Sequence, residues 1–220
     1  MVAASPPLLF DLDGTLTDNF LGISRSIRYA LARLDTPAPD DSVLRRCVGP
    51  PLRESFAWLL DTNDQGVIEH AITLYRERFS EVGWRENSVY DGMPATMTAL
   101  AEGASPMYVC TSKPEVFARR IVTLFGFAEC LDGIYGADLA GKFDDKVKLV
   151  AHVAATERFD PGLAIMIGDR SHDIRAARMN GARSVGVLWG YGSRDELTGA
   201  TAVVADPREL PLALANLATP

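Results

Sequence analysis

LLFDLDGTLTD, at residues 8–18, is the most informative segment of this chain. Three apolar residues lead into two carboxylates, Asp11 and Asp13, and Gly14 follows them. A short apolar run that closes at glycine predicts a buried parallel strand that opens into a tight turn at its carboxyl end. Open α/β sheets bind their ligands outside that end of the strands, so we expect the chemistry of the protein to lie there.

Asp11 and Asp13 are one residue apart, and alternate residues of a strand point to the same side. Two carboxylates that close repel each other unless a cation lies between them, and a hard cation such as Mg²⁺ suits oxygen ligands. A carboxylate can also act as a nucleophile and form an aspartyl-phosphate, while a second carboxyl group moves the proton of the leaving group. The alternative is a plain strand-end turn in which Asp and Gly act only as turn formers.

The composition is that of an ordinary globular protein, with 220 residues, 47% hydrophobic and 23% charged. This length suits one large domain or a core with a modest insert. The net charge of -7 argues against a nucleic-acid-binding surface, which needs a basic face. We find no signal peptide and no apolar run of membrane-spanning length, so we expect a cytoplasmic protein that does not associate with membranes. The cysteines lack metal-ligand spacing and are expected to be reduced.

After Thr17 the hydrophobic pattern changes from strand to helix. Apolar residues recur at steps of three and four, which predicts helices at residues 19–34, 42–48, 52–60 and 67–82. Nothing between residues 20 and 85 indicates a strand. We therefore predict a helical domain at residues 18–85, of the size of a small bundle, inserted into a domain formed by residues 1–17 and 86–220.

From Val89 onward, predicted strands and helices alternate. The strands fall at residues 107–110, 134–135, 163–167, 184–188 and, weakly, 202–204. We predict four helices in this part of the chain. The first follows the turn at residues 90–94 and ends at residue 100, the second extends from Pro114 to about residue 125, and the others cover residues 146–155 and 174–180. This alternation predicts a Rossmann-like α/β fold, with a parallel sheet and helices on both of its faces.

Two further strand ends carry polar residues. Thr111 and Ser112 follow one strand and open a helix, where hydroxyl and amide groups can bind an anion, although an ordinary helix cap is the alternative. Asp169 and Asp173 follow another strand and can bind a metal ion or orient its ligands. The alternative there, an N-cap and an acid in the first helical turn, explains only one of the two aspartates.

DLDGTLTD resembles the first motif of the haloacid dehalogenase superfamily of phosphohydrolases, and GDRSHD at residues 168–173 resembles its last motif, GDxxxD. This resemblance implies that Asp11 is the nucleophile. It implies that Asp13 is the general acid and base and gives Mg²⁺ its backbone carbonyl. It further implies that Asp169 binds Mg²⁺ directly and that Asp173 holds a metal-bound water or ligand in place.

The resemblance also implies which groups bind the phosphoryl oxygens. In the resembled family these groups are a Thr or Ser at a strand end, matched by Thr111 with Ser112 beside it, and a lysine at a helix start. Lys146 matches the lysine because it begins the predicted helix at residues 146–155, and Lys142 is the alternative. Arg53, after Gly-Pro-Pro, is a candidate to contact a second anionic or polar group of the substrate, with a plain surface arginine as the alternative.

The helical insert and residues 186–193 resemble the branch of the superfamily that includes phosphoglycolate phosphatases. Our main hypothesis is therefore a phosphoglycolate phosphatase-like, Mg²⁺-dependent hydrolase that cleaves a small phosphorylated metabolite through an aspartyl-phosphate intermediate, as a monomer or homodimer. A 5′-nucleotidase-type phosphatase, a phosphomutase of the β-phosphoglucomutase kind, and a non-enzymatic phosphate-binding or interaction module are the alternatives. The sequence does not choose between phosphoglycolate, a nucleoside monophosphate and a sugar phosphate.

Overall fold

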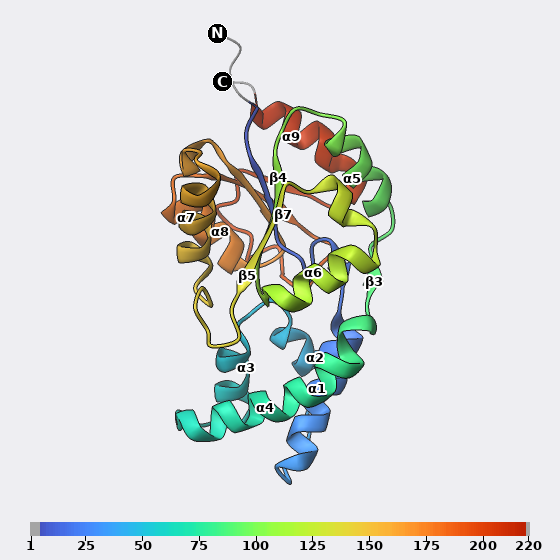
Figure 1. The fold of residues 1–220 in the computed structure, drawn as a ribbon, viewed down its shortest axis with the longest axis vertical. Helices are drawn as coiled ribbons and strands as arrows, with labels where there is room; N and C mark the ends of the chain where they lie inside the picture. The colour runs from blue at the N-terminus through green and yellow to red at the C-terminus, as the bar shows by residue number, and fades with distance from the viewer. Residues whose placement is uncertain (1–4, 219–220) are drawn as a thin grey trace. The chain divides into compact units, whose positions relative to one another are not determined.

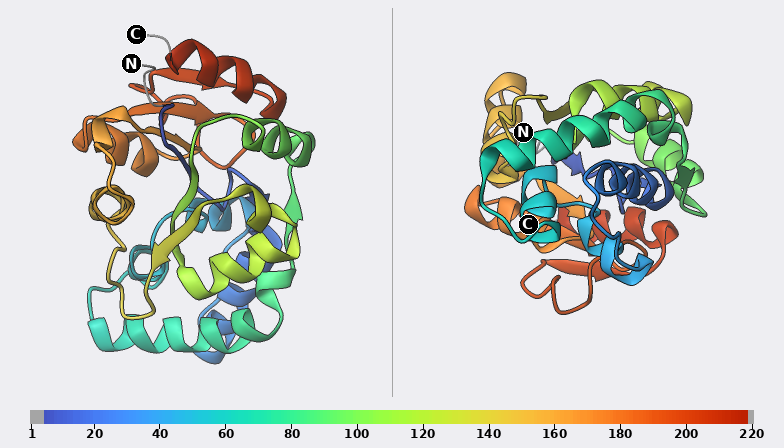
Figure 2. Two further views of the ribbon diagram at one scale, coloured as in Figure 1. Left: turned by 45° about the horizontal axis from the view of Figure 1, so that its top comes forward. Right: turned by 90° about the horizontal axis from the view of Figure 1, so that it is seen from below.

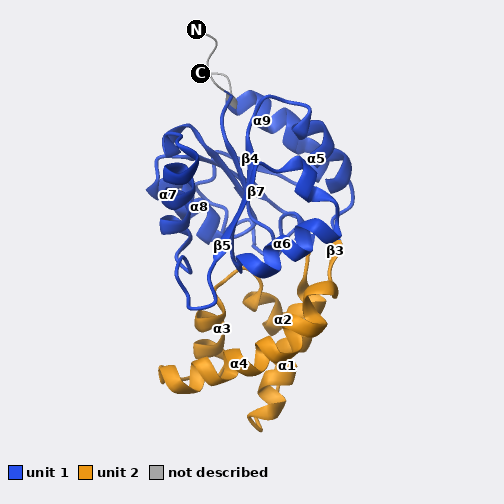
Figure 3. Cartoon of the chain, in the orientation of Figure 1, with its two compact units in different colours: residues 1–17, 89–220 blue, residues 18–88 orange. Residues whose placement is uncertain are grey.

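The computed structural model describes residues 5–218, which divide into two compact units (Figure 3). Unit 1 contains the described residues up to Thr17 and from Val89 onward, and unit 2 is Asp18–Ser88. The sequence-based division placed the second boundary at residue 85. None of the helices in the described chain combines the length and the apolar character that crossing a membrane requires.

Within the described residues, unit 1 contains a six-stranded parallel sheet in the order β5-β4-β1-β6-β7-β8 (Figure 1). Its strands are β1 (Leu8–Phe10), β4 (Met107–Pro114), β5 (Gly133–Ala137), β6 (Ile165–Gly168), β7 (Arg183–Val187) and β8 (Ala202–Val204). In the centre, Phe10 of β1 pairs with Val109 of β4 on one side and with Ile167 of β6 on the other. The polar residues that follow these three strands therefore emerge side by side at one edge of the sheet.

The helices of unit 1 cover both faces of the sheet, which confirms the predicted fold class. They are α5 (Met93–Ala101), α6 (Glu115–Leu124), α7 (Lys146–Glu157), α8 (Ser171–Met179) and α9 (Leu210–Ala218), with 3₁₀ turns at Phe127–Cys130, Pro161–Leu163 and Pro207–Glu209. On one face, Leu9 and Cys110 pack with Val150 of α7 and Ala177 of α8. Figures 1 and 2 show α5 and α6 across the sheet from α7 and α8. The strands are thus buried on both sides, as their continuous apolar sequences require.

β4 is longer than the sequence predicted, because it continues past Cys110 to Pro114. Its pairing with β5 shifts register between Thr111 and Pro114. A Cβ atom on Gly136 of β5 would lie 2.4 Å from the carbonyl oxygen of Lys113, so only glycine allows this close approach. Pro114 is consequently the N-cap of α6. Our prediction that the helix begins at Pro114 was wrong by one residue, since α6 begins at Glu115.

Unit 2 is helical, with α1 (Phe20–Arg33), α2 (Asp41–Leu44), α3 (Leu52–Leu59), α4 (Gln65–Glu81) and 3₁₀ turns at Arg45–Cys47 and Gly83–Arg85. The backbones of α1 and the turn after α4 approach closely, since a Cβ atom on Gly22 would lie 2.0 Å from the carbonyl oxygen of Gly83. The two-residue strands β2 (Thr17–Asp18) and β3 (Ser88–Val89) pair where the chain leaves and re-enters unit 1. The absence of strands that we predicted for residues 20–85 agrees with the described structure.

Candidate active site

Three buried aspartates converge at the carboxyl edge of the sheet in unit 1. Asp11 follows β1, Asp169 follows β6, and Asp173 lies in the first turn of α8. One carboxylate oxygen from each lies within 4.8 Å of the others. Asp169 and Asp173 come 158 and 162 positions after Asp11 in the sequence, so the sheet topology brings the three residues together.

Lys146 supplies positive charge to this cluster. Its Nζ atom lies 3.0 Å from Oδ1 of Asp11 and 2.5 Å from Oδ1 of Asp173. Burial lowers the pKa of Lys146, but the charges of the two aspartates outweigh burial and raise the pKa above its usual value. Lys146 therefore stays protonated, and its positive charge lies directly beside the carboxylate of Asp11. Lys142, the alternative lysine, is exposed, with Nζ 4.9 Å from the ring centre of Phe143.

The cluster carries more negative than positive charge, because one ammonium group faces three carboxylates. Burial, reinforced by the charges of Asp173 and Asp11, raises the pKa of Asp169 well above its usual value. Burial also raises the pKa of Asp173 to about 6, although the charge of Lys146 opposes this increase. A divalent cation would remove this electrostatic cost, so the charge balance of the cluster fits a metal site.

The two oxygens of Asp169 have different surroundings. Oδ2 accepts a hydrogen bond of 2.7 Å from the backbone amide of Tyr191. Oδ1 is buried and has no hydrogen-bond partner among residues 5–218. A buried oxygen without a donor is costly unless another ligand satisfies it, and a hard cation does so. The residues present therefore fit Mg²⁺.

The side chain of Asp13 is not part of the three-aspartate cluster. Its Oδ2 atom forms a buried ion pair of 2.6 Å with Nζ of Lys113. The sequence alone indicates no role for Lys113, because the extension of β4 that brings it to Asp13 depends on pairing with Gly136. The resemblance assigned Asp13 a metal contact only through its backbone carbonyl, and a side chain that pairs elsewhere is compatible with that.

Thr111 is buried within β4, and its hydroxyl oxygen accepts a hydrogen bond of 3.3 Å from the backbone amide of Lys113. Ser112 is half-buried beside it. Arg53 belongs to α3 in unit 2, where its Nε donates to Oε1 of Glu69 at 2.5 Å. Part of the charge of Arg53 is thus compensated within unit 2, and its contact with a substrate stays a prediction.

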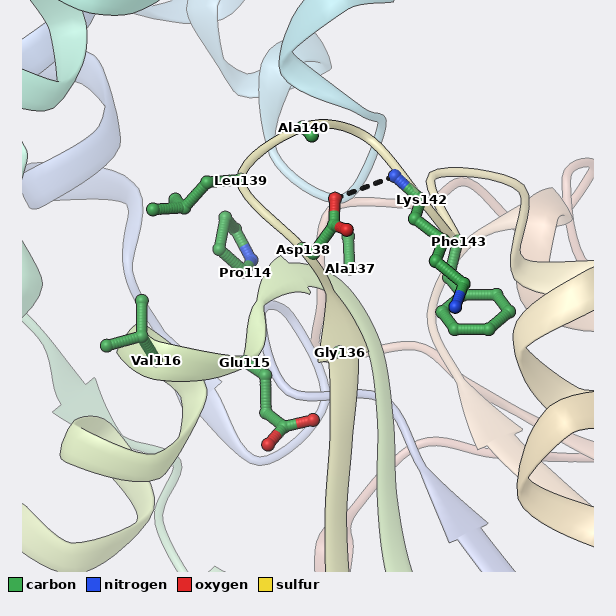
Figure 4. A pocket seen from close by; sticks show the side chains of 10 residues that line it. All are labelled: Pro114, Glu115, Val116, Gly136, Ala137, Asp138, Leu139, Ala140, Lys142 and Phe143. Carbon is green, nitrogen blue, oxygen red and sulfur yellow. Dashed lines mark hydrogen bonds between the residues drawn. The ribbon is translucent and has the colours of Figure 1, made fainter. Parts of the chain in front are cut away.

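A pocket of about 550 Å³ in unit 1 lies between the start of α6 and the loop that leads from β5 to Lys146 (Figure 4). Its walls are Pro114, Glu115, Val116, Gly136, Ala137, Asp138, Leu139, Ala140, Lys142 and Phe143. The loop is closed by Oδ1 of Asp138, which accepts a hydrogen bond of 2.8 Å from the backbone amide of Lys142. The mixture of apolar and charged walls suits an organic group with a few polar atoms.

Comparison with known proteins gives consistent results. Residues 8–187 match the family described as haloacid dehalogenase-like hydrolase. A 5′-nucleotidase from Pseudomonas aeruginosa is 44% identical over 192 residues, which cover 87% of this chain and 86% of that protein. The crystal structure of a predicted phosphatase from Clostridium acetobutylicum superposes with a TM-score of 0.93 at 38% identity, covering 97% of this chain and 100% of the other.

Two further groups of relatives carry other names. The tyrosine-protein kinase PtkA of Mycobacterium tuberculosis is 40% identical over 192 residues, which cover 87% of this chain but 65% of that protein. Proteins named phosphoglycolate phosphatase match at 26% to 29% identity. The superfamily that the two aspartate motifs indicated is confirmed by these matches.

Proposed function

The chain belongs to the haloacid dehalogenase-like hydrolase family and is a phosphatase, and from this premise we propose that it hydrolyses small phosphomonoesters with Mg²⁺ through an aspartyl-phosphate on Asp11. The observation that carries the proposal is the buried cluster of Asp11, Asp169 and Asp173 with Lys146 beside it. The geometry supports one carboxylate as nucleophile and the others as groups that hold a cation.

We assign the metal to Asp11, Asp169 and the backbone carbonyl of Asp13, with Asp173 holding these ligands or a bound water in place. When bound, Mg²⁺ supplies positive charge that stabilises the phosphoryl oxygens as negative charge moves onto them. Lys146 and Thr111, with Ser112, bind the same oxygens from the protein side. The charge of Lys146 already lies next to Asp11, so it needs little rearrangement to act there.

In the first step an oxygen of Asp11 forms a bond to phosphorus while the bond between phosphorus and the leaving oxygen breaks. Asp13, in its protonated form, gives its proton to that leaving oxygen. In the second step the carboxylate of Asp13 takes a proton from a water molecule as the water oxygen bonds to phosphorus. The bond between phosphorus and Asp11 then breaks and inorganic phosphate leaves.

Nucleoside 5′-monophosphates are the substrates that the comparisons support best. The relative named 5′-nucleotidase matches over most of both chains at 44% identity, whereas the phosphoglycolate phosphatases match at 26% to 29%. The sequence alone did not choose between these substrates, although its resemblance pointed first to phosphoglycolate phosphatases and gave a 5′-nucleotidase as an alternative. Pro114, which lines the pocket in Figure 4, directly follows Lys113, the residue that pairs with Asp13. The apolar walls of this pocket suit the base or sugar of such a substrate.

A substrate panel tests this proposal. We expect phosphate release from nucleoside 5′-monophosphates to exceed release from phosphoglycolate or sugar phosphates, and to require Mg²⁺. A sugar phosphate that is isomerised without phosphate release would favour a phosphomutase instead.

Incubation with ATP, followed by detection of phosphotyrosine, tests the tyrosine-kinase activity for which the mycobacterial relative is named. If no phosphorylated compound, including p-nitrophenyl phosphate, is cleaved in the presence of Mg²⁺, the enzymatic proposal is wrong and a phosphate-binding module remains.

Lys113→Met is expected to slow the cleavage of alkyl phosphates by about 10²-fold, because it leaves Asp13 without the partner that fixes its carboxylate. An alkoxide needs a proton as it leaves, whereas p-nitrophenolate does not. The initial burst of p-nitrophenolate should therefore keep its wild-type rate. Stopped-flow measurement of the burst, beside steady-state release from a nucleoside monophosphate, checks both expectations.

Lys113→Arg, which keeps the positive charge, is the matched control and should retain more of the alkyl phosphatase activity. An equal loss of both rates in Lys113→Met would show that Lys113 has a general structural role and does not act through Asp13.

A further inference from the structure

Residues 189–192, which we call the WGYG loop, follow β7 and contact Asp169 of the candidate metal site. The backbone amide of Tyr191 donates to Oδ2 of Asp169 at 2.7 Å. The indole Nε1 of Trp189 donates to the carbonyl oxygen of Thr15 at 3.0 Å. The loop therefore binds both the aspartate after β6 and the turn after β1.

The two glycines of the WGYG loop leave no space for a side chain. A Cβ atom on Gly190 would lie 2.3 Å from the carbonyl oxygen of Gly14 and 2.4 Å from Cβ of Asp169. A Cβ atom on Gly192 would lie 1.8 Å from the carbonyl oxygen of Asp169. Neither glycine is among the positive-φ residues of the described chain, so contact distance, and not backbone conformation, requires glycine here.

An ion pair fixes the chain that follows the WGYG loop. Nε of Arg170 donates to Oε2 of Glu196 at 2.9 Å, and the Arg170 side chain is 11% exposed. Arg170 directly follows Asp169, so the segment beyond the loop is tied to the neighbour of the aspartate that the loop contacts. The loop is thereby anchored at both of its ends, by β7 and by this ion pair.

We propose that the WGYG loop is a positioning element for the metal site, which selects Oδ1 of Asp169 as the metal-binding atom. The amide of Tyr191 occupies Oδ2 and leaves Oδ1 buried without a partner in the described residues. The contacts of Trp189 and Gly190 hold the β1 turn and Asp169 at a fixed separation. Fixing a ligand in advance strengthens metal binding because less freedom is lost when the metal arrives.

This inference rests on the proposed Mg²⁺ dependence, and its test measures binding and not turnover. The chain has three tryptophans, so Trp58→Phe with Trp84→Phe leaves Trp189 as the only one. Its fluorescence then reports directly on the loop during a Mg²⁺ titration. We expect Gly190→Ala in this background to weaken Mg²⁺ binding by about 10-fold to 100-fold, the usual effect of disturbing groups that orient metal ligands.

Gly199→Ala is the matched control, because its added methyl group meets nothing within 4 Å while its φ of +96° strains the backbone. Gly199→Ala therefore shows how a general loss of stability, without any new contact to Asp169, affects Mg²⁺ binding. We expect the Mg²⁺ affinity of this variant to stay within about 2-fold of that of the parent. Glu196→Gln serves as a second variant that loosens the anchor without filling space, in case Gly190→Ala does not fold. We expect it to weaken Mg²⁺ binding by several-fold.

The outcomes separate the two proposals. A folded Gly190→Ala protein with the parent's Mg²⁺ affinity overturns the role of the WGYG loop and leaves the proposed function standing. If Gly190→Ala does not fold, unchanged affinity in Glu196→Gln overturns it equally. A parent protein that binds no Mg²⁺ at millimolar concentration, by fluorescence and by calorimetry, overturns the metal dependence and the loop's role together.

Discussion

Asp11→Asn should abolish phosphatase turnover, lowering kcat by about 10⁴-fold or more, because an amide cannot form the aspartyl-phosphate. The substitution preserves the size and shape of the side chain. It also removes one of three buried negative charges near Lys146, which keeps its 2.5 Å pair with Asp173. We therefore expect a thermal unfolding temperature no lower than that of the wild type, so the loss of turnover is chemical and not structural.

Asp13→Asn is the control that separates the two carboxylates of the first motif. It keeps the nucleophile and removes the group that takes a proton from water, so p-nitrophenyl phosphate should phosphorylate the enzyme once and then stop. Intact-protein mass spectrometry after rapid quenching should detect the phosphoryl adduct in Asp13→Asn and not in Asp11→Asn. Turnover by Asp11→Asn within 10-fold of the wild type, about 1.4 kcal/mol in the barrier, would exclude Asp11 as the nucleophile.

The sequence predicted those parts of the fold that depend on residues close to one another in the chain. The apolar run before Asp11 and the one before Asp169 each predict a buried strand, and the residues after each strand must then emerge at the same edge of a parallel sheet. The helices of unit 2 were predicted for the same reason, since their apolar periodicity depends only on neighbours three and four positions away.

The parts that could not be predicted depend on contacts between distant residues. The pair of Lys113 with Asp13 requires β4 to continue beside Gly136, and no local pattern reveals that register. The hydrogen bond from Trp189 to Thr15 joins residues 174 positions apart. The segment containing Trp189 resembled a branch of the family, but the resemblance did not tell what the segment contacts.

The sequence-based predictions were wrong in detail for two helices, α9 and α8, and in both cases the reason lies in neighbouring residues. We did not predict α9, whose sequence LPLALANLA is apolar without a clear face and has proline at its second position. Proline is tolerated there because the amide of the first turn has no helical partner. We also placed the start of α8 at residue 174, whereas it begins at Ser171, since Oδ2 of Asp173 accepts a 3.0 Å hydrogen bond from the amide of Arg170. The residue expected to serve the metal thus also caps the helix.

Asp169→Asn is expected to have opposite effects on stability and on activity. Burial raises the pKa of Asp169, and such a carboxyl group loses its contribution to stability as the pH rises through its folded-state pKa. Asparagine does not titrate, and its amide oxygen can still accept from Tyr191. Without metal, the variant should therefore unfold at a higher temperature than the wild type at neutral pH, and the difference should shrink as the solution is acidified.

With Mg²⁺ the order should reverse, because the wild type gains a bound cation and the variant has lost the free carboxylate oxygen that receives it. We expect kcat to fall by about 10³-fold. Differential scanning fluorimetry over a series of pH values, with and without Mg²⁺, measures both effects in one experiment. A variant that Mg²⁺ still stabilises as much as the wild type would mean that Asp169 is not a ligand. The cation would then have to be held by Asp11 and the backbone carbonyl of Asp13, with Asp173 beside them.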